Sequence, residues 1–579
     1  MADRIDRTTA SPHPSIFYNM GPSLGLAAWA SLLTVVSAQF KCSLPAGDIC
    51  AYENATTYAA VNAPNCTTSG LQAFLNKLPG LEGTTLSVPY AFYIDSNATL
   101  DEFTDYVGAT TFTTDIPSVC AFRVNGTNEQ GATWGLGALL PTHFNGSIMM
   151  AAPDSGLSWG VASAGLRYAF ATFASNSGHD EPDYIPGWET PNGLLDWSHR
   201  ALHLSTVTAK AIVKAWYDVE PKYSYITGCS DGGRQVMKSI QTYPEDYDGA
   251  MAGAPTWWMT HQAFYNYKQT TIGGSARSNS SIPPSLYPVI TDEVLRQCDP
   301  QDNLTDSIIS NPRGCFFNPE ALACSSNKTS NCLTAPQLDT LHKIYNDWTT
   351  FDQDLIYPGV WFGSEPTWNT TFGSPHSKSW YIENVLGFKN FTAQDLTYEI
   401  IAEADARDPA HANADDFDLS PFFNRGGKFF HWHGMSDSVV SPGSSVYYHH
   451  KATYAALEKG IDIDQHYQLY LIPGLEHCTG TPSCMAALWY LAGPYQAGNF
   501  FNSTPANVVD NYVHDSFLTL ISWVEGGHAP SYMVTTNFED NADPTTLLHN
   551  RKICPYPQQA NWTQTGVSIH EDYWDCIYV

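Results

Sequence analysis

The chain has 579 residues, of which 43% are hydrophobic, and its 27 Lys and Arg residues face 57 Asp and Glu residues, for a net charge of −30. This length can bury a large core and favours either several domains or one domain with a large insertion. The negative charge disfavours nucleic acid and anionic membranes as partners, because both would be repelled, but it names no substrate.

The first 38 residues are typical of a secretory signal peptide. A short apolar run, Leu24 to Ala38, ends in Val36-Ser37-Ala38, a small-residue pattern that signal peptidase accepts. The run is too short to cross a bilayer comfortably, so a transmembrane anchor is the weaker interpretation. The polar stretch before Met20 is unusual for a signal peptide, and translation from Met20 would leave a compact leader. We therefore expect residues 1–38 to direct secretion.

Two further features agree with secretion. Asn-x-Ser/Thr sequons, each a candidate N-glycosylation site, are dense along the chain. They begin at Asn54, Asn65, Asn97, Asn125, Asn145, Asn279, Asn303, Asn327, Asn369, Asn390, Asn502 and Asn561. The 13 cysteines include several close pairs, which could bind zinc in a cytosolic protein but beside a leader favour disulfides. Because the count is odd, at least one thiol is free, intermolecular or lost with a processed segment.

The segment from 201 to 242 reads as helix, strand, tight turn and helix. Apolar residues recur at helical spacing over 201–218, and the short segment 223–227 is rich in β-forming residues. A turn, Gly228-Cys229-Ser230-Asp231-Gly232-Gly233, separates this strand from an expected helix over 234–242. Such alternation is typical of a doubly wound, mostly parallel sheet and predicts an α/β fold.

The turn contains Gly228-x-Ser230-x-Gly232, which matches a nucleophile elbow. In that structure the serine backbone is strained, and glycines on either side leave room for it. The turn exposes the serine Oγ, and the N-terminus of the next helix stabilises negative charge, so the N–H of Asp231 becomes an oxyanion donor. The pattern also occurs by chance in structural turns, but its place between strand and helix favours the nucleophile.

Residues 256–426 do not alternate strands and helices and are rich in Pro, Asn, Trp and paired cysteines. We interpret this stretch as a lid domain inserted into the α/β core, because binding and catalytic sites are commonly completed by such additions. The core then consists of residues 39–255 and 427–579.

Two strands near the C-terminus each lead to a polar residue. Residues 428–432 form an expected strand that leads to Asp437, followed by a helix-like segment over 446–457, and the strand over 467–472 leads to His477. The chain order Ser, Asp, His at three strand ends is that of an α/β-hydrolase triad. His477 would then be the general base that takes the serine proton, and Asp437 would orient it.

Alternatives exist for each member of this triad. Taken singly, Asp437 could cap the following helix and His477 could be a surface histidine; taken together they predict the triad. The rival bases are His431, His433 and His528, but none of them lies in a last-strand loop downstream of a suitable acid.

Cysteines flank both proposed partners, since Cys229 precedes Ser230 and Cys478 follows His477. If Ser230 and His477 share a hydrogen bond, their neighbours lie within the Cα separation that a disulfide requires. We therefore expect a Cys229–Cys478 bridge that ties nucleophile and base together; two unrelated buried thiols are the alternative.

These motifs resemble the tannase and feruloyl esterase family. Besides the elbow, the matching segments are Ser177-Gly178-His179, residues 196–201 (DWSHRA), residues 243–249 (YPEDYDG) and residues 252–255 (AGAP). The resemblance covers roughly residues 66–579 and implies an α/β-hydrolase with an inserted lid that cleaves esters of hydroxylated aromatic acids. It places the family signature on Cys229-Ser230, Asp437 and His477-Cys478.

The glycine-rich loop that usually supplies the second oxyanion donor in this family is replaced here by Met149-Met150-Ala151-Ala152-Pro153-Asp154-Ser155-Gly156, with Gly156 as the candidate donor.

Disulfides are also expected at Cys298, Cys315, Cys324, Cys332, Cys554 and Cys576. The pairing of Cys42, Cys50, Cys66, Cys120 and Cys484 stays open.

A loop in the expected lid carries closely spaced carboxylates between Cys298 and Cys315, and hard oxygen ligands in a turning loop suit calcium. By resemblance, the ligands are the side chains of Asp299, Asp302 and Asp306 and the carbonyls of Leu304 and Ile308. Asn303 and Ser307 stand where the family tends to have Gly, and Asn tolerates positive φ. The alternative is a solvated acidic loop.

Together these features predict a secreted serine esterase that acts through an acyl-serine intermediate, with structural calcium and no organic cofactor. The expected substrate is a small aromatic ester or an ester of plant cell-wall polysaccharide. Two alternatives remain: an esterase for other aryl or polyester-fragment esters, and an inactive hydrolase fold used for binding. The sequence does not rank ferulate against gallate, and it leaves the oligomeric state open.

Overall fold

The computed structural model describes residues 57–96, 117–153, 156–181, 187–273, 278–372, 380–500, 512–539, 546–566 and 568–578. The expected signal peptide, residues 1–38, lies outside these ranges, as do the sequons at Asn54, Asn97 and Asn502 and the cysteines Cys42 and Cys50. Within the ranges, no helix combines the length and the apolar character needed to cross a bilayer.

A central sheet, with ten strands in the described part of the chain, organises the fold. Its strand order is β14-β13-β10-β9-β7-β8-β5-β4-β2, and β3 also pairs with β4. The strands from β14 to β8 are parallel, whereas β5, β4, β3 and β2 run antiparallel to their neighbours. The bounds are β2 Thr84–Ser87, β3 Ala91–Ile94, β4 Val119–Asn128, β5 Thr133–Pro141, β7 Ser147–Ala151, β8 Ala171–Ser175, β9 Tyr223–Cys229, β10 Gly249–Gly253, β13 Lys428–Gly434 and β14 Tyr467–Ile472.

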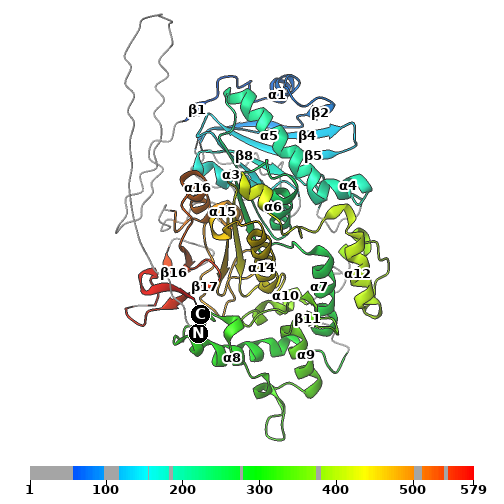
Figure 1. Ribbon diagram of the computed structural model, residues 1–579, viewed down its shortest axis with the longest axis vertical. Helices are drawn as coiled ribbons and strands as arrows, with labels where there is room; N and C mark the ends of the chain where they lie inside the picture. The colour runs from blue at the N-terminus through cyan, green and yellow to red at the C-terminus, as the bar shows by residue number, and fades with distance from the viewer. Residues whose placement is uncertain are drawn as a thin grey trace, which may run out of the picture. The chain divides into compact units, whose positions relative to one another are not determined.

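Helices cover both faces of this sheet, since successive strand residues point to opposite sides (Figure 1). On one face, Ile226 and Phe429 pack with apolar residues of α5, α6 and α14. On the other, their sequence neighbours Tyr225 and Phe430 pack with α16, and α3 covers β7 and β8. The bounds of the helices that flank the sheet are α3 Trp159–Gly165, α5 Ala201–Tyr217, α6 Asp231–Thr242, α14 Pro442–Glu458, α15 Gly493–Phe500 and α16 Ser516–Gly526.

The predicted elements around the elbow match these elements closely. The helix expected over 201–218 is α5, the strand over 223–227 is the first part of β9, and the strands over 428–432 and 467–472 are β13 and β14. The helix over 234–242 begins earlier, at Asp231, because the elbow itself forms its first turn.

The chain between β10 and β13, two neighbouring strands, contributes no described strand to the central sheet. It forms its own hydrophobic cluster around residues such as Tyr265, Ile290 and Trp368, with all members inside the insertion. Its elements are α7 Met259–Gly273, α8 Tyr287–Cys298, α9 Ala335–Tyr345, β11 Trp348–Thr349, β12 Leu355–Tyr357, α10 Trp368–Thr371, α12 Tyr398–Arg407 and α13 Ser420–Asn424. Helices α7, α8, α9 and α10 lie together in Figure 1. Phe422 and Phe423 of α13, in contrast, belong to the hydrophobic cluster of the central sheet.

Two antiparallel hairpins follow the last core helix. They consist of β15 Met533–Phe538 with β16 Leu547–Ile553, and of β17 Gln558–Trp562 with β18 Trp574–Tyr578. Near the N-terminus are β1 Tyr58–Ala59, α1 Thr68–Leu75 and β6 His143–Phe144, and α4 Pro191–Leu195 precedes α5.

Candidate active site

Ser230 lies in the turn between β9 and α6 with a strained backbone, φ 59° and ψ −122°. The turn needs its glycines. A Cβ on Gly228 would lie 2.6 Å from the Gly232 backbone, and a Cβ on Gly232 would lie 2.5 Å from the carbonyl oxygen of Ala152. Side chains at either position would therefore force backbone apart, and strain of this kind is characteristic of functional turns.

Ser230, His477 and Asp437 come together in one hydrogen-bonded row. His477 Nε2 is 2.8 Å from Ser230 Oγ, and His477 Nδ1 is 2.7 Å from Asp437 Oδ2. The three residues meet because β9, β13 and β14 are parallel and each residue follows the carboxyl end of its strand. When His477 Nδ1–H donates its hydrogen bond to the Asp437 carboxylate, Nε2 of the neutral imidazole is free to accept the serine proton.

Asp437 is fully buried and still has the environment of an anion. Its Oδ1 accepts hydrogen bonds from the backbone N–H of Val439 at 2.8 Å and of Val440 at 2.9 Å. Burial alone would raise the pKa of Asp437, but His477 and His433 together hold it below the usual range of a carboxyl group. The carboxylate is therefore ionised at neutral pH.

Cys229 and Cys478 form a disulfide, with Cα atoms 6.1 Å apart. Both are buried, and Cys478 has a positive φ of 64°. The bridge joins the last residue of β9 to the residue after His477, so it fixes the loop that carries the imidazole against the strand that carries the serine.

The three rival bases occupy positions other than that of His477. His431 is buried in β13, and His528 is exposed beyond α16. His433 is buried behind Asp437, with Nε2 3.1 Å from Asp437 Oδ2. Sequence reasoning considered His433 only as a competing base and missed this contact, because a spacing of four residues predicts contact on a helix and His433 lies near the end of a strand.

The structure describes both candidate oxyanion donors, Asp231 and Gly156, but not the whole of the loop that carries Gly156. Asp231 is the first residue of α6, and its carboxylate pairs with the buried Arg234, whose Nε is 2.6 Å from Oδ1. Gly156 has a positive φ of 63°, but Asp154 and Ser155 lie outside the described residues. The role of Gly156 as second oxyanion donor stays a prediction.

The acidic loop of the insertion turns sharply. Asn303 and Ser307 both have positive φ, 68° and 65°, at the two positions where the family tends to have glycine. Asp299 ties the ends of the loop together, since its Oδ1 and Oδ2 accept hydrogen bonds from the N–H groups of Asp306 and Ser307.

The acidic loop carries oxygen donors of the type that calcium prefers. Burial raises the pKa of Asp299 and of Asp302, and Asp302 Oδ2 is buried without a hydrogen bond of normal geometry. Asp306, however, forms an ion pair with Arg551. Within the described ranges, no three or more His, Cys, Asp or Glu side chains converge as a metal-binding group.

The remaining cysteines of the described part form four more disulfides and leave Cys484 free and exposed. The pairs are Cys66–Cys120, Cys298–Cys315, Cys324–Cys332 and Cys554–Cys576.

Most sequons of the described part are exposed, but Asn145 is buried and its Nδ2 donates to the carbonyl oxygen of Tyr168 at 2.9 Å.

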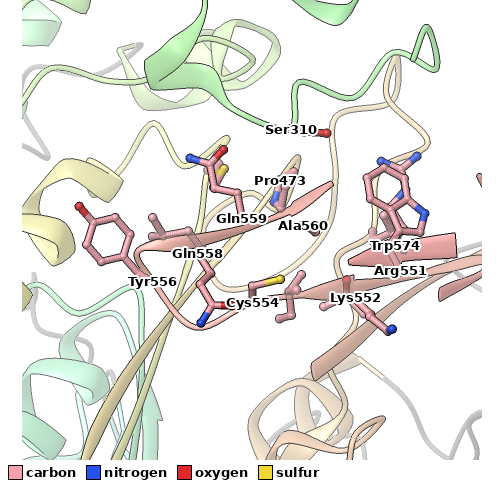
Figure 2. Close-up of a pocket in the computed structure, with 15 residues that line it drawn as sticks. Ser310, Pro473, Arg551, Lys552, Cys554, Tyr556, Gln558, Gln559, Ala560 and Trp574 are labelled. Atoms are coloured by element: carbon pink, nitrogen blue, oxygen red, sulfur yellow. The ribbon is translucent and has the colours of Figure 1, made fainter. Parts of the chain in front are cut away.

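A small pocket beside β14, shown in Figure 2, is separate from the triad. It lies among Met435, Arg551, Trp574 and the β17 residues Gln558 and Gln559. Its volume of about 40 Å³ has room for ordered water but not for an aromatic acid. None of the triad residues lines it, so we do not assign the substrate to it.

The parallel sheet, the strained turn after β9 and the three strand-end residues make this an α/β-hydrolase fold. The sequence matches the family model described as tannase and feruloyl esterase over residues 139–415 and 406–577. The chain belongs to the tannase and feruloyl esterase family.

Individual relatives agree with this assignment. A probable feruloyl esterase B-1 of Aspergillus oryzae is 30% identical over 79% of this chain and 84% of its own length. The crystal structure of feruloyl esterase B from Aspergillus oryzae has a TM-score of 0.76 at 25% identity, covering 87% of this chain and 100% of that one. Tannin acyl hydrolase from Aspergillus niger shares the fold, with a TM-score of 0.63 at 17% identity, over 89% of this chain and 97% of that chain.

Proposed function

We propose that this protein is a serine carboxylesterase that hydrolyses esters of hydroxylated aromatic acids, of the feruloyl or galloyl type. The observation that carries the proposal is the row Ser230 Oγ, His477 and Asp437, with hydrogen-bond distances of 2.8 and 2.7 Å. Carboxylic ester hydrolysis follows from the family, and the feruloyl esterases among the relatives support the aromatic acyl group.

In the proposed reaction Ser230 Oγ attacks the ester carbonyl while His477 Nε2 takes its proton. The tetrahedral oxyanion collapses, the C–O bond to the alcohol breaks, and His477 returns the proton to the departing alkoxide. Water then attacks the acyl-serine, and His477 takes a proton from this water. Collapse breaks the bond between the acyl carbon and Ser230 Oγ, which regains the proton from His477, and the aromatic acid is released. Asp437 stays ionised throughout and stabilises the imidazolium.

The developing oxyanion needs donors. We assign one to the backbone N–H of Asp231, at the N-terminus of α6, where the helix dipole adds to its effect. The bidentate pair with Arg234 supports this role, because it holds the Asp231 carboxylate away from the reacting oxygen. Gly156 remains the candidate for the second donor.

The insertion, residues 256–426, would act as the lid over this site. Contacts between the insertion and the loop of the triad acid support that role: the hydroxyls of Thr367 and Thr371 lie 2.5 and 2.6 Å from Ser438 Oγ, one residue beyond Asp437.

We further propose that the acidic loop binds structural calcium through Asp299, Asp302, Asp306, Leu304 and Ile308. The buried Oδ2 atom of the half-buried Asp302 supports this, and Arg551 would have to release Asp306.

The protein is proposed to be secreted and glycosylated, which its disulfides support. Exposed sequons in the described part are Asn65, Asn279, Asn303, Asn327, Asn369, Asn390 and Asn561. Asn125 is half-buried. A glycan on Asn145 would break a buried hydrogen bond, so glycopeptide mapping of the secreted protein should find Asn145 unmodified. Absence of the protein from the medium of its host would contradict secretion.

The test of the proposed substrate class is a panel of methyl ferulate, caffeate, p-coumarate and gallate, with a terephthalate monoester as the polyester fragment. We expect at least one hydroxylated aromatic ester to have the highest kcat/KM, and Ser230→Ala to be inactive on it. Preference for the terephthalate ester would favour the alternative esterase. No hydrolysis of any ester by folded protein would favour the inactive, binding alternative.

A further inference from the structure

The proposed triad acid has a second imidazole partner that the reaction above does not use. His433 is fully buried in β13, and its Nε2 is 3.1 Å from Asp437 Oδ2 and 3.0 Å from the carbonyl oxygen of Val440. Both of these oxygens can only accept. His433 Nε2 must therefore carry a proton and donate it toward the carboxylate.

A chain of hydrogen bonds continues behind His433. Its Nδ1 is 2.6 Å from Ser445 Oγ, which lies on α14 and is in turn 2.8 Å from His431 Nε2. His431 Nδ1 is 2.8 Å from the hydroxyl of Tyr467, the first residue of β14. All of these residues are buried, so water does not compete for the bonds.

The donors of this chain can all point the same way. Burial raises the pKa of Tyr467 well above its ordinary value, so the phenol keeps its proton and can donate a hydrogen bond to His431 Nδ1. Burial also lowers the pKa of His431, which is therefore neutral and in this order donates from Nε2 to Ser445. The Ser445 hydroxyl then donates to His433 Nδ1, and every donor is directed toward Asp437.

We propose that His433 is a positioning residue for the triad, which holds the Asp437 carboxylate in the orientation that serves His477 and is itself locked by Ser445, His431 and Tyr467. The proposal rests on the function proposed above for Ser230, Asp437 and His477. Asp437 Oδ1 is held by two backbone N–H groups and Oδ2 by two imidazoles, so the carboxylate cannot rotate without breaking a bond.

The second imidazole also sets the basicity of the acid. A donor on Asp437 Oδ2 withdraws negative charge from the oxygen that accepts the His477 proton. Without this donor the carboxylate would stabilise the imidazolium more strongly, and the pKa of His477 would rise. The other titratable groups that act on this region are Glu476 beside His477, Tyr357 of β12, and His449 of α14, which faces His431. The substitutions below leave all three unchanged.

The experiment compares His433→Asn with His433→Gln on the preferred methyl ester of the panel. The Asn amide reaches Ser445 but falls short of Asp437, whereas the Gln amide can place an N–H near the position of Nε2. For His433→Asn we expect kcat to fall roughly 10- to 100-fold, the cost of one hydrogen bond to a charged group, with KM little changed. The acid limb of the kcat/KM profile should move to higher pH, and His433→Gln should recover most of both effects.

Two results would overturn the proposal. One is a folded His433→Asn with wild-type kcat and an unshifted acid limb. The other is an equal loss of kcat in both variants that parallels their loss of melting temperature, with the acid limb of the kcat/KM profile unshifted. That result would mean that His433 acts only through packing. If neither variant folds, Ser445→Ala tests the same chain one bond further back: a smaller shift in the same direction supports the proposal, and an unshifted limb contradicts it. Failure of the underlying function is distinguishable, because Ser230→Ala would then remain active.

Discussion

The side chain of Asp437 illustrates how individual residues carry this site. It is fully buried, yet its two oxygens accept hydrogen bonds from Val439, Val440, His433 and His477. An unpaired carboxylate in such a place would take up a proton, because burial penalises its charge. The four donors replace the water that it lost, and they keep the ion available to stabilise the imidazolium.

The Cys229–Cys478 bridge should matter to activity more than its loop entropy alone suggests, because it sets the distance between Ser230 and His477. Replacing both cysteines by Ala frees the loop that carries His477, so we expect most of the activity to be lost at temperatures where the variant is still folded. Removing Cys324 and Cys332, a bridge inside the insertion with a sequence separation of 8, is the matched control and should leave kcat nearly unchanged. Peptide mapping that finds either Cys229 or Cys478 as a free thiol in active enzyme would contradict this role.

His449 should make stability depend on pH. Burial lowers its pKa to about 4, and neither ring nitrogen has a hydrogen-bond partner within the described residues. Because the folded pKa lies below the unfolded value of about 6.5, the contribution of His449 to stability is present above about pH 6.5 and is lost as pH falls toward 4. This loss reaches about 2 kcal/mol near pH 5.

His449→Phe removes this titration and keeps an aromatic ring against Tyr467 and Tyr556. The free energy of unfolding of the variant minus that of wild type, measured in urea, should therefore be more positive near pH 5 than at pH 8. An identical difference at both values of pH would mean that His449 does not titrate in this way.

For single residues, the sequence predicts functional groups that follow the ends of strands. It does not predict contacts that depend on where a side chain points. Ser230, Asp437 and His477 could be named because each follows a recognisable strand in the right order. The contact between His433 and Asp437 depends on the bend of the chain after β13, which brings residues four apart face to face, and no periodicity in the sequence encodes that bend.

At the scale of elements, the parallel strands and their helices were the predictable part. Strands β9, β13 and β14 are compact apolar runs flanked by turns, so their pattern is clear from sequence. The antiparallel strands β4 and β5 and the hairpins β15/β16 and β17/β18 were not predicted. In β5, Thr133–Pro141, the residues are nearly all buried, and a continuous apolar run does not show alternation.

The acidic loop of residues 299–308 should stabilise the folded protein when it binds calcium. A ligand that binds only the folded state adds RT ln(1 + [L]/Kd), about 2.7 kcal/mol at a hundredfold excess over Kd. Chelation should therefore lower the melting temperature and leave initial rates in cool buffer nearly intact. Asp302→Ala should mimic chelation and respond little to added calcium, whereas Asp352→Ala, an exposed acid of the same insertion, should behave like wild type.

Two outcomes separate this assignment from its alternatives. If a chelator abolishes turnover at once in enzyme that is still folded, the metal takes part in the chemistry. If neither chelation nor Asp302→Ala moves the melting temperature, residues 299–308 are an acidic turn held by Asp299 and by the ion pair of Asp306 with Arg551.

For the whole molecule, the family assignment and the geometry of the triad agree. The family match extends across most of the chain, and the structure brings together three residues that are separated in sequence by 247 and 40 positions. The insertion has a hydrophobic cluster of its own and contacts the loop of Asp437 through Thr367 and Thr371. Together these features support the proposed esterase.

The most direct test of this account is the turnover of Ser230→Ala on the preferred ester of the panel. The substitution removes one oxygen from a half-buried position, so the variant should fold and melt like wild type. We expect kcat to fall by roughly 10⁴-fold or more, because the substitution removes the oxygen that would form the acyl intermediate. A folded Ser230→Ala that keeps turnover within about tenfold of wild type would contradict the assignment of Ser230 as the nucleophile.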